Sequence, residues 1–199
     1  MSETATGHTR GGDTRARIQQ VALGLFAEQG YERTSLREIA ERLGVTKAAL
    51  YYHFKSKEDI VFSFTEDYFS EFDEMIAWAR EQPPGPASRY AIVERYLDIV
   101  ERGSEVFRFL ERNQATMRGI DGGKHRFEQF RPRFAALIDV MIGPDADLRT
   151  RVRATMALLT VNFGWIFFSR DDPDLVPDPL DPAELRAVVL EIANSLANP

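Results

Sequence analysis

Apolar residues recur along most of the chain at three- and four-residue spacing, which is typical of one face of an α-helix. The first such segment predicts a helix that is capped by Asp13 or Thr14 and ends near Gln29. Its apolar stripe consists of Ile18, Val21, Ala22, Leu25 and Phe26. Strand-like alternation of apolar and polar residues does not interrupt the pattern, so we expect an all-α fold.

Two short helices are predicted next, on the strength of their caps. Ser35 and Glu38 form a capping box that opens the first, and Gly44 ends it. Thr46 is a suitable N-cap for the second, which we expect to run from Lys47 to about His53.

Longer helices follow. One begins at Ser56 to Asp59 and ends at the prolines from Pro83 onward. Glycine- or proline-containing breaks, including one at Gly103, separate the others. These are expected near residues 87–102, 104–117, 123–142, 146–170 and 182–197. The prediction is therefore an all-α chain of about nine helices.

A helix-turn-helix needs a small residue where its two helices touch, a glycine at the turn and apolar residues that face a third helix. Ala40 and Gly44 meet the first two needs. The inward apolar set is Leu36, Ile39, Leu43, Val45 and Leu50. A plain corner between two helices of an enzyme would satisfy part of this pattern, so the spacing alone leaves both interpretations open.

The distribution of charge favours the DNA-reading interpretation. A net charge of −6 argues at first against a nucleic-acid partner, because phosphate binding needs positive surface. Between Arg33 and Lys57, however, only Glu38 and Glu41 are acidic. The basic residues of this stretch are Arg33, Arg37, Arg42, Lys47, Lys55 and Lys57. A small positive patch is thus attached to an acidic remainder.

Other classes of function find little support. The chain has no cysteine, which excludes disulfides and cysteine-ligated metals and fits a reducing cytoplasm. We expect a cytoplasmic protein with no membrane partner, since no run of about 18 apolar residues and no apolar leader is present. The three histidines, His8, His53 and His125, lie in separate segments, so neither a metal site nor a nucleophile–base pair is predicted. We expect no cofactor, and an enzyme remains only a competing class.

The run TSLREIAERLGVTKAALYYHFKSKEDI, preceded by ALGLFAEQGYER, closely resembles the DNA-binding domain of the TetR family over roughly residues 14–61. The matching elements are Phe26, Gly30-Tyr31, Thr34-Ser35, Ile39-Ala40, Gly44-Val45, the block Leu50 to Phe54 and the block Lys55 to Glu58. The resemblance implies a homodimeric, ligand-responsive repressor that a small molecule releases from a palindromic operator. A constitutive DNA-binding regulator without effector is the alternative.

Each candidate DNA contact has its own chemical reason. Thr34 and Ser35 can bind a phosphate at a helix N-terminus, or serve as caps alone. Lys47 can reach a guanine edge or a phosphate, or remain a solvated charge, while Ala48 and Ala49 are short enough to let the helix approach thymine methyls. The full set is Thr34, Ser35, Thr46, Lys47, Ala48, Ala49, Tyr51, Tyr52, His53 and Lys57.

Several of these roles come from the resemblance. It implies that the tyrosine hydroxyls and the histidine of Tyr51-Tyr52-His53 meet backbone phosphates, and that Lys57 adds a charged contact. Packing is nearly as good an interpretation for Tyr51. Arg37 is a further candidate, or pairs with Glu41 four residues on.

The domains follow from these assignments: a flexible arm over residues 1–12, a three-helix DNA-binding domain over 13–56, and a ligand-binding and dimerisation domain over 57–199. The helix expected at 146–170 has two apolar stripes, so it needs a partner on each side, one of them a second subunit. The alternative is a monomer with an unusually central helix. The predicted interface residues are Leu148, Val152, Leu159, Phe163, Leu185, Val188, Ile192 and Leu196.

The middle of the chain is rich in aromatic residues and methionine, most of which we assign to the core. A minority, with a few polar groups that orient a ligand, are expected to line a cavity for a lipophilic or aromatic effector. Each polar group could equally be a satisfied or exposed side chain. The candidates are Tyr68, Phe107, Asn113, Met117, His125 and Trp165.

Overall fold

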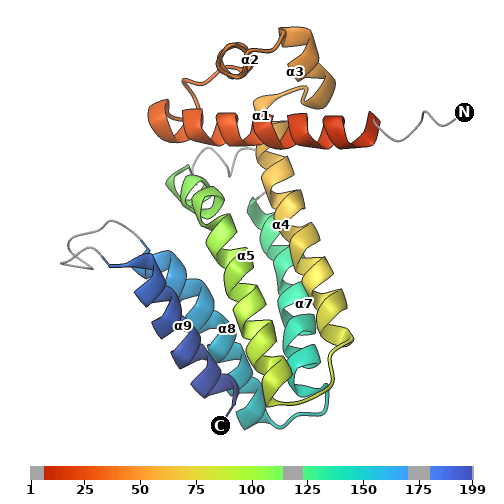
Figure 1. Cartoon of the computed structure of the whole chain (residues 1–199), viewed down its shortest axis with the longest axis vertical. Coiled ribbons are helices and arrows are strands. Elements are labelled where there is room, and N and C mark those ends of the chain that lie inside the picture. Colours follow the sequence, from red (N-terminus) through yellow and green to blue (C-terminus); the bar gives the residue numbers. More distant parts are fainter. Residues whose placement is uncertain (1–6, 114–122, 170–179, 199) are drawn as a thin grey trace, which may run out of the picture. The chain divides into compact units, whose positions relative to one another are not determined.

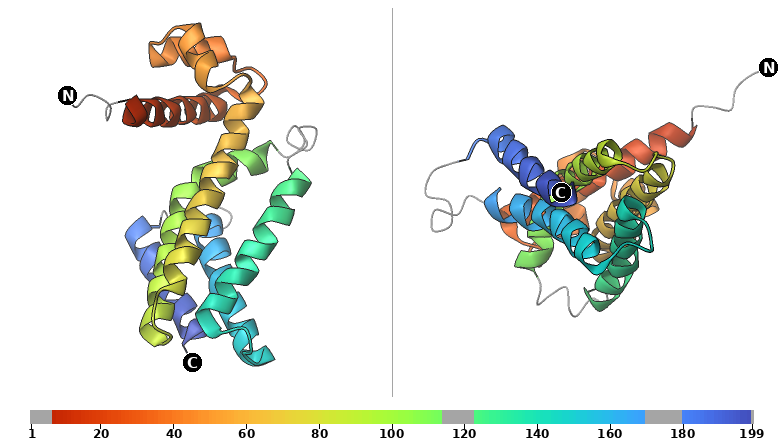
Figure 2. Two further views of the ribbon diagram at one scale, coloured as in Figure 1. Left: turned by 90° about the vertical axis from the view of Figure 1, so that its right-hand side faces the viewer. Right: turned by 90° about the horizontal axis from the view of Figure 1, so that it is seen from below.

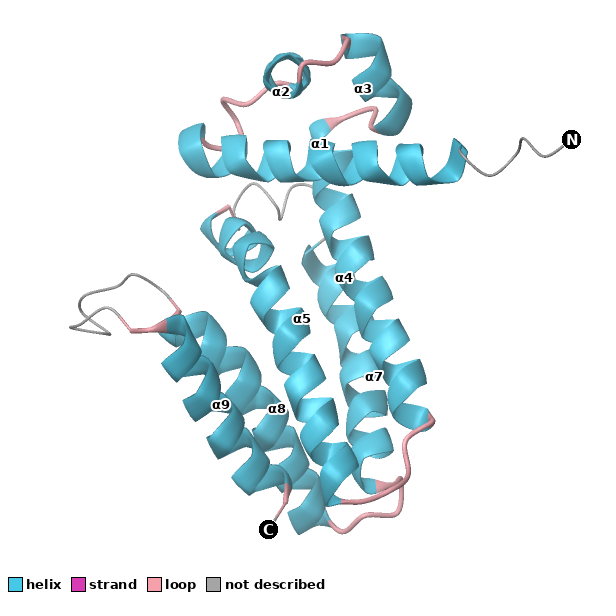
Figure 3. Ribbon diagram, in the orientation of Figure 1, coloured by secondary structure: helices cyan, strands magenta, loops and turns pink. Residues whose placement is uncertain are grey.

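The chain is all-helical. The computed structural model describes residues 7–113, 123–169 and 180–198, with side chains from residue 13 in the first range and from 128 in the second. This part of the chain forms eight helices and no strand (Figures 1 and 3), which confirms the all-α prediction of about nine helices. The helices are α1 (Gly7–Gln29), α2 (Leu36–Leu43), α3 (Lys47–His53), α4 (Lys57–Arg80), α5 (Pro86–Arg112), α7 (Gly123–Ile142), α8 (Leu148–Phe168) and α9 (Pro182–Ala197). None of the described helices is long and apolar enough to cross a membrane.

The helices group into two compact units. The first unit takes in the described residues up to Asp67 and those from Val106 to the end of α5. The second unit contains Tyr68–Glu105 and the described residues from His125 onward. This division cuts through α4 and α5, whereas the functional boundary between residues 56 and 57 stays a prediction.

The core of the first unit is built on the apolar stripe of α1, in which Ile18, Ala22, Leu25 and Phe26 are buried as expected. Leu50 of α3 and Phe54 at its C-terminus join them. Phe109, near the C-terminal end of α5, belongs to the same core: its ring stacks on Phe26, with 5.1 Å between centroids. The first unit thus draws on a residue far along the chain.

In the second unit, α8 and α9 lie side by side (Figures 1 and 2). Their approach is close at Gly164, where an added Cβ would stand 3.1 Å from a methyl carbon of Val189. Arg186 of α9 donates to Glu101 of α5 at 2.6 Å, and Arg133 of α7 donates to Asp73 of α4 at 2.8 Å. Ion pairs therefore tie the outer helices to α4 and α5 around an apolar core.

Two helix boundaries differ from the prediction. α1 begins at Gly7, so residues 7–12, expected in a flexible arm, are helical; residues 1–6 lie outside the described residues. The break expected at Gly103 is also wrong, because α5 continues through it. A Cβ at Gly103 would meet the Tyr68 ring at 3.2 Å, so this glycine makes room for an aromatic ring rather than ending the helix.

Candidate functional sites

The turn between α2 and α3 has the geometry of a helix-turn-helix. The Ser35 hydroxyl accepts from the Glu38 N–H, and the Ser35 N–H donates to the Glu38 carboxylate at 2.7 Å, so the predicted capping box is present. Gly44 ends α2 with φ at 72°, in the left-handed region where a side chain costs energy. Thr46 then caps α3 by accepting from Ala49 N–H at 3.1 Å.

α3 presents a continuous exposed surface. Leu50 is fully buried and anchors the helix in the first unit. Thr46, Lys47, Ala48 and Ala49 are all exposed. Tyr52 is 80% exposed, which is unusual for a large aromatic side chain unless a partner covers it. The side chains at the start of α3 are short apart from Lys47, so another molecule can approach the backbone closely.

The aromatic side chains on either side of Tyr52 are less exposed to solvent. Tyr51 and His53 are half-buried, and the ring of His53 meets Tyr52 edge-on at 5.2 Å between centroids. The Lys47 ammonium lies 5.3 Å from the centre of the Tyr51 ring. Packing, the alternative interpretation of Tyr51, therefore accounts for part of its role, and its ring also positions the lysine.

Two other predicted DNA contacts are turned inward. Thr34 is only 2% exposed and its hydroxyl donates to the Gly30 carbonyl at 2.9 Å, so we correct its assignment to a structural one. The Lys57 ammonium donates to the Tyr31 carbonyl at 2.7 Å and lies 4.3 Å from the centre of the Tyr31 ring. A contact from Lys57 to DNA would first have to break this arrangement.

Ser35 is exposed, but its surroundings do not suit an anion. The Glu38 carboxylate takes up both the N–H and the hydroxyl of Ser35. These hydrogen bonds lower the pKa of Glu38, so its negative charge persists where a phosphate would bind. Capping, the alternative role of Ser35, is the one that the geometry displays.

A hydrogen bond between the turn that follows α1 and the start of α4 was not predicted from the sequence. The Tyr31 hydroxyl, at the end of a nearly buried ring, donates to the Glu58 carboxylate at 2.7 Å. Burial, followed by the contact with Glu58, raises the pKa of Tyr31 well above its usual range. The same hydrogen bond lowers the pKa of Glu58. Both residues stand in the matching blocks of the family resemblance, which was the only available signal.

Of the two roles predicted for Arg37, a DNA contact and an ion pair with Glu41, the structure displays the ion pair. Its side chain is exposed and its Nε donates to Glu41 at 2.7 Å, one helical turn on. Lys55 and Arg42 are further exposed cations near the turn, and neither was predicted to contact DNA. Arg42 pairs with Glu28, whereas the Lys55 ammonium donates to the Tyr51 carbonyl.

The predicted ligand residues are divided between the units. Tyr68 and Trp165 belong to the second unit, where Trp165 is buried in the core and Tyr68 packs half-buried against it. Phe107 and Asn113 belong to the first; Phe107 is exposed, and the Asn113 amide donates to the Phe109 carbonyl at 2.8 Å. Met117 and the side chain of His125 lie outside the described residues.

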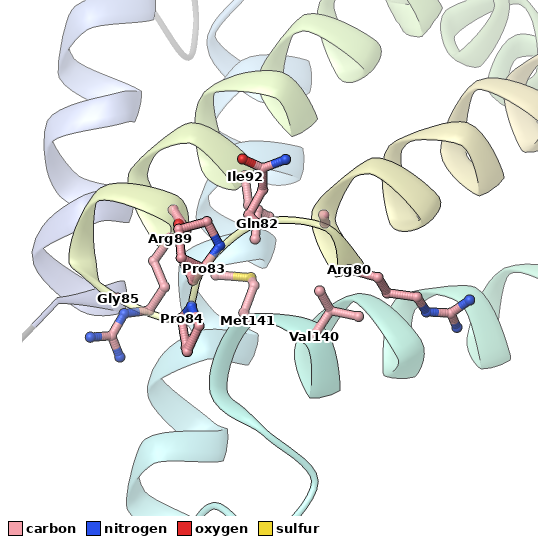
Figure 4. A pocket seen from close by; sticks show the side chains of 11 residues that line it. Arg80, Gln82, Pro83, Pro84, Gly85, Arg89, Ile92, Val140 and Met141 are labelled. Atoms are coloured by element: carbon pink, nitrogen blue, oxygen red, sulfur yellow. The ribbon is translucent and has the colours of Figure 1, made fainter.

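A recess of about 280 Å³ opens in the second unit at the turn between α4 and α5 (Figure 4). Pro83, Pro84, Met141 and two arginines are among its lining residues, and no predicted ligand residue is. Figure 4 shows the guanidinium groups of Arg80 and Arg89 pointing away from each other. They do not converge on one anion. Among the described residues, no group of three or more histidine, aspartate or glutamate side chains could hold a metal ion.

The outer face of α8 and α9 carries exposed apolar side chains. Most of the predicted interface residues lie there: Leu148, Val152, Phe163, Val188 and Ile192 are exposed, and Leu159 and Leu196 are half-buried. The prediction that Leu185 lies in the interface is corrected, because this side chain is only 8% exposed and is part of the core of its own unit. The second stripe of α8, with Leu158, Val161 and Trp165, faces that core.

Comparison with known proteins bears on the first unit most directly. Residues 18–64 match the family model of bacterial regulatory proteins of the tetR family. Over 48 residues the chain is 54% identical to the HTH-type transcriptional regulator AcrR of Shigella flexneri, which is 24% of this chain and 22% of that protein. An HTH-type transcriptional regulator of Staphylococcus aureus is 26% identical over 154 residues, which cover 75% of this chain and 78% of the relative.

Solved structures extend the likeness to the whole fold. A transcriptional regulator of Aquifex aeolicus superposes with a TM-score of 0.67 at 20% identity, covering 89% of this chain and 96% of that one. A TetR/AcrR-family regulator of Thermobifida fusca is 26% identical, with a TM-score of 0.51 and coverage of 94% and 97%. With the helix-turn-helix geometry of α2 and α3, these matches show that the chain carries the DNA-binding domain of the TetR family of transcriptional regulators and shares the fold of its members.

Proposed function

We propose that this regulator is a homodimeric repressor that binds a palindromic operator through α3 and leaves it when a lipophilic or aromatic molecule binds the second unit. The observation that carries the proposal is the surface of α3. It follows a helix-turn-helix corner, exposes Lys47, Ala48, Ala49 and Tyr52 together, and is anchored by a fully buried Leu50. A helix with this surface fits the major groove.

The chemistry of α3 supports base contacts at its start and backbone contacts at its end. Lys47 is the charged side chain of the first turn of α3, and the methyl groups of Ala48 and Ala49 can lie against thymine methyls. Tyr52 presents a hydroxyl group suited to a phosphate oxygen. Recognition of this kind needs a binding surface and no catalytic group.

The exposed apolar face of α8 and α9 supports a homodimer. Phe163 on α8 and Ile192 on α9 are exposed, large and apolar, which is costly unless another surface covers them. A second copy can present the same face, and the resulting two-fold symmetry forms a four-helix interface. Two α3 helices would then enter successive major grooves about 34 Å apart, which requires a palindromic site.

Release by an effector distinguishes the proposed repressor from a constitutive DNA-binding regulator. A ligand that favours the released form must bind the free protein more tightly than the DNA complex, with a coupling of about 1 to 3 kcal/mol. An operator affinity that stays unchanged across a broad screen of lipophilic and aromatic compounds would favour the constitutive alternative.

The test begins with selection of binding sites from random DNA duplexes. Lys47→Ala is then compared with the unmodified protein on the selected site and on a scrambled duplex over a series of salt concentrations. The expected loss on the selected site is about 1 to 3 kcal/mol, with blurred preference at one base pair per half-site. Arg80→Ala, an exposed cation of the second unit, serves as the control and should leave affinity unchanged.

If Lys47→Ala loses the same affinity for both duplexes, Lys47 contacts a phosphate and not a base. No loss from either Lys47→Ala or Tyr52→Ala would remove α3 from the DNA interface and overturn the proposal. The dimer is tested separately by sedimentation of Phe163→Glu with Ile192→Glu, which should yield folded monomers. An unmodified protein that is already monomeric at micromolar concentration would contradict the assigned interface.

A further inference from the structure

The inner face of α8 carries two buried polar atoms that have no partner among the described residues. One is the indole Nε1 of Trp165, a side chain only 5% exposed. The other is the hydroxyl of Ser169, the C-cap residue, whose backbone N–H donates to the Trp165 carbonyl. The two residues are four apart, so their side chains are neighbours on one side of the helix. A buried donor without an acceptor is costly, so such atoms are normally satisfied by a bound molecule or ordered water.

A third polar group extends this face toward the centre of the helix. Asn162 lies one turn before Trp165, and its amide donates to the hydroxyl of Tyr96 on α5. Tyr96 is fully buried, and the ring of Phe72 meets it edge-on at 5.6 Å between centroids. Burial raises the pKa of Tyr96 well above its usual range, so its hydroxyl stays protonated and neutral. The Asn162–Tyr96 pair therefore lies beside an aromatic ring.

The surroundings of this face suit only a neutral molecule. Trp165 and Tyr96 belong to the buried apolar and aromatic cluster of the second unit, and no charged side chain is buried in the part of this unit that the structure describes. An ion brought into such a cluster would lose its hydration without gaining a counter-charge. Ser169 is itself only half-buried, so the polar face reaches the end of α8 rather than being closed within the core.

We propose that Asn162, Trp165 and Ser169 form a polar anchor on α8 for an uncharged, lipophilic ligand that carries a hydrogen-bond acceptor such as a ketone or ester carbonyl. The indole N–H can only donate, so it selects for an acceptor, and a carbonyl oxygen can accept from both Trp165 and Ser169. The inference rests on the proposed effector-binding function of the second unit. It narrows the ligand from lipophilic compounds in general to those with an acceptor oxygen.

The test uses two probes that differ only in the acceptor: benzophenone, which has a carbonyl, and diphenylmethane, which does not. The chain contains two tryptophans, Trp78 and Trp165, so the ¹⁵N-labelled protein gives two indole N–H signals that Trp165→Phe assigns. Benzophenone should shift the Trp165 signal and bind on the order of tenfold more tightly than diphenylmethane. The Trp78 signal should stay in place.

Variants distinguish a hydrogen bond from general apolar contact. Trp165→Phe keeps an aromatic ring but removes the indole donor, so most of the preference for benzophenone over diphenylmethane should be lost. Trp78→Phe is the matched control and should retain the preference, because Trp78 packs under Arg95 with 4.8 Å between guanidinium carbon and ring centre. Ser169→Ala should reduce the preference in part.

Equal binding of the two probes, absence of binding by both, or a preference that is undiminished in Trp165→Phe would overturn the anchor. These titrations are done without DNA, so they do not depend on repression. Operator binding by the same proteins is measured in parallel: a protein that binds its operator but shows no acceptor preference contradicts the anchor alone. A protein that shows the preference but does not bind DNA contradicts the proposed function instead.

Discussion

Phe109 offers a sharp test of how the first unit is held together. It stands near the end of α5, yet its ring stacks on Phe26 and lies 6.2 Å from the centre of the Tyr31 ring. The side chain is 5% exposed, whereas Phe107 on the same helix is 45% exposed. The two phenylalanines lie a short distance apart in the sequence on the same helix, and the main difference between them is how deeply the side chain is buried.

Phe109→Ala should destabilise the first unit by about 3 to 5 kcal/mol, the usual cost of removing a buried aromatic ring and leaving a cavity. Loss of two aromatic contacts adds to the upper end of this range. Phe107→Ala should cost within about 0.5 kcal/mol, since its ring already faces solvent. Both variants make the same Phe→Ala change on the same helix, so a difference in their stability reports the burial of the ring and not the residue type or the helix propensity.

Amide hydrogen exchange of residues 36–53 measures the effect where it is expected. In Phe109→Ala, protected amides of α2 and α3 should exchange faster by a factor on the order of a hundred to several thousand, because each 1.4 kcal/mol is tenfold. Operator affinity should fall in parallel. If the two variants change exchange equally, Phe109 does not support the DNA-binding helices and the assignment of its ring to their core is wrong.

Three further variants test local features of the two units. Tyr31→Phe should raise the pKa of Glu58 toward its ordinary value of about 4.3, as followed by NMR titration. Because the folded-state pKa of Glu58 is lowered, its stabilising effect is full above that ordinary value and is lost as pH falls through the folded-state pKa, so the unmodified protein and the variant should converge in stability in acid. Gly44→Ala should cost about 1 kcal/mol in thermal unfolding, since φ is 72°, and Gly44→Asn should cost less; equal costs would contradict this reason. Gly164→Ala places a Cβ 3.1 Å from a methyl carbon of Val189, so it should be less favourable by about 1 to 3 kcal/mol in the presence of Val189 than in the Val189→Ala background; equal effects in both backgrounds would refute that contact as the cause.

Local chemistry made parts of the fold predictable from the sequence. The capping box of Ser35 and Glu38, the glycine at position 44 and the cap at Thr46 are each decided within a few residues, and each appears as expected. The two-sided α8 was also predictable, because the period of its apolar residues is a property of the helix itself. One of its stripes is buried and the other is exposed.

What could not be predicted depends on neighbours far along the chain. The role of Gly103 depends on Tyr68, whose ring fills the space of a missing Cβ. Leu185 shares the apolar pattern of α9 with Ile192, and only the packing against α8 decides which of them is buried. Thr34 was assigned to DNA because it precedes a helix, but its hydroxyl is satisfied by the Gly30 carbonyl. The unpaired atoms of Trp165 and Ser169 likewise exist only once the helices have packed.

The presence of Phe109 in the core of the first unit limits how this regulator can be recombined with others. A hybrid that joins residues 1–67 to a foreign effector domain would leave Phe26 and Tyr31 without the ring that packs on them. The exchange would succeed only if the incoming α5 carried an aromatic residue in register with Phe109, or if residues 106–112 were transplanted with the N-terminal segment. A hybrid that keeps residues 1–67 of this chain therefore depends on one ring that this segment does not contain.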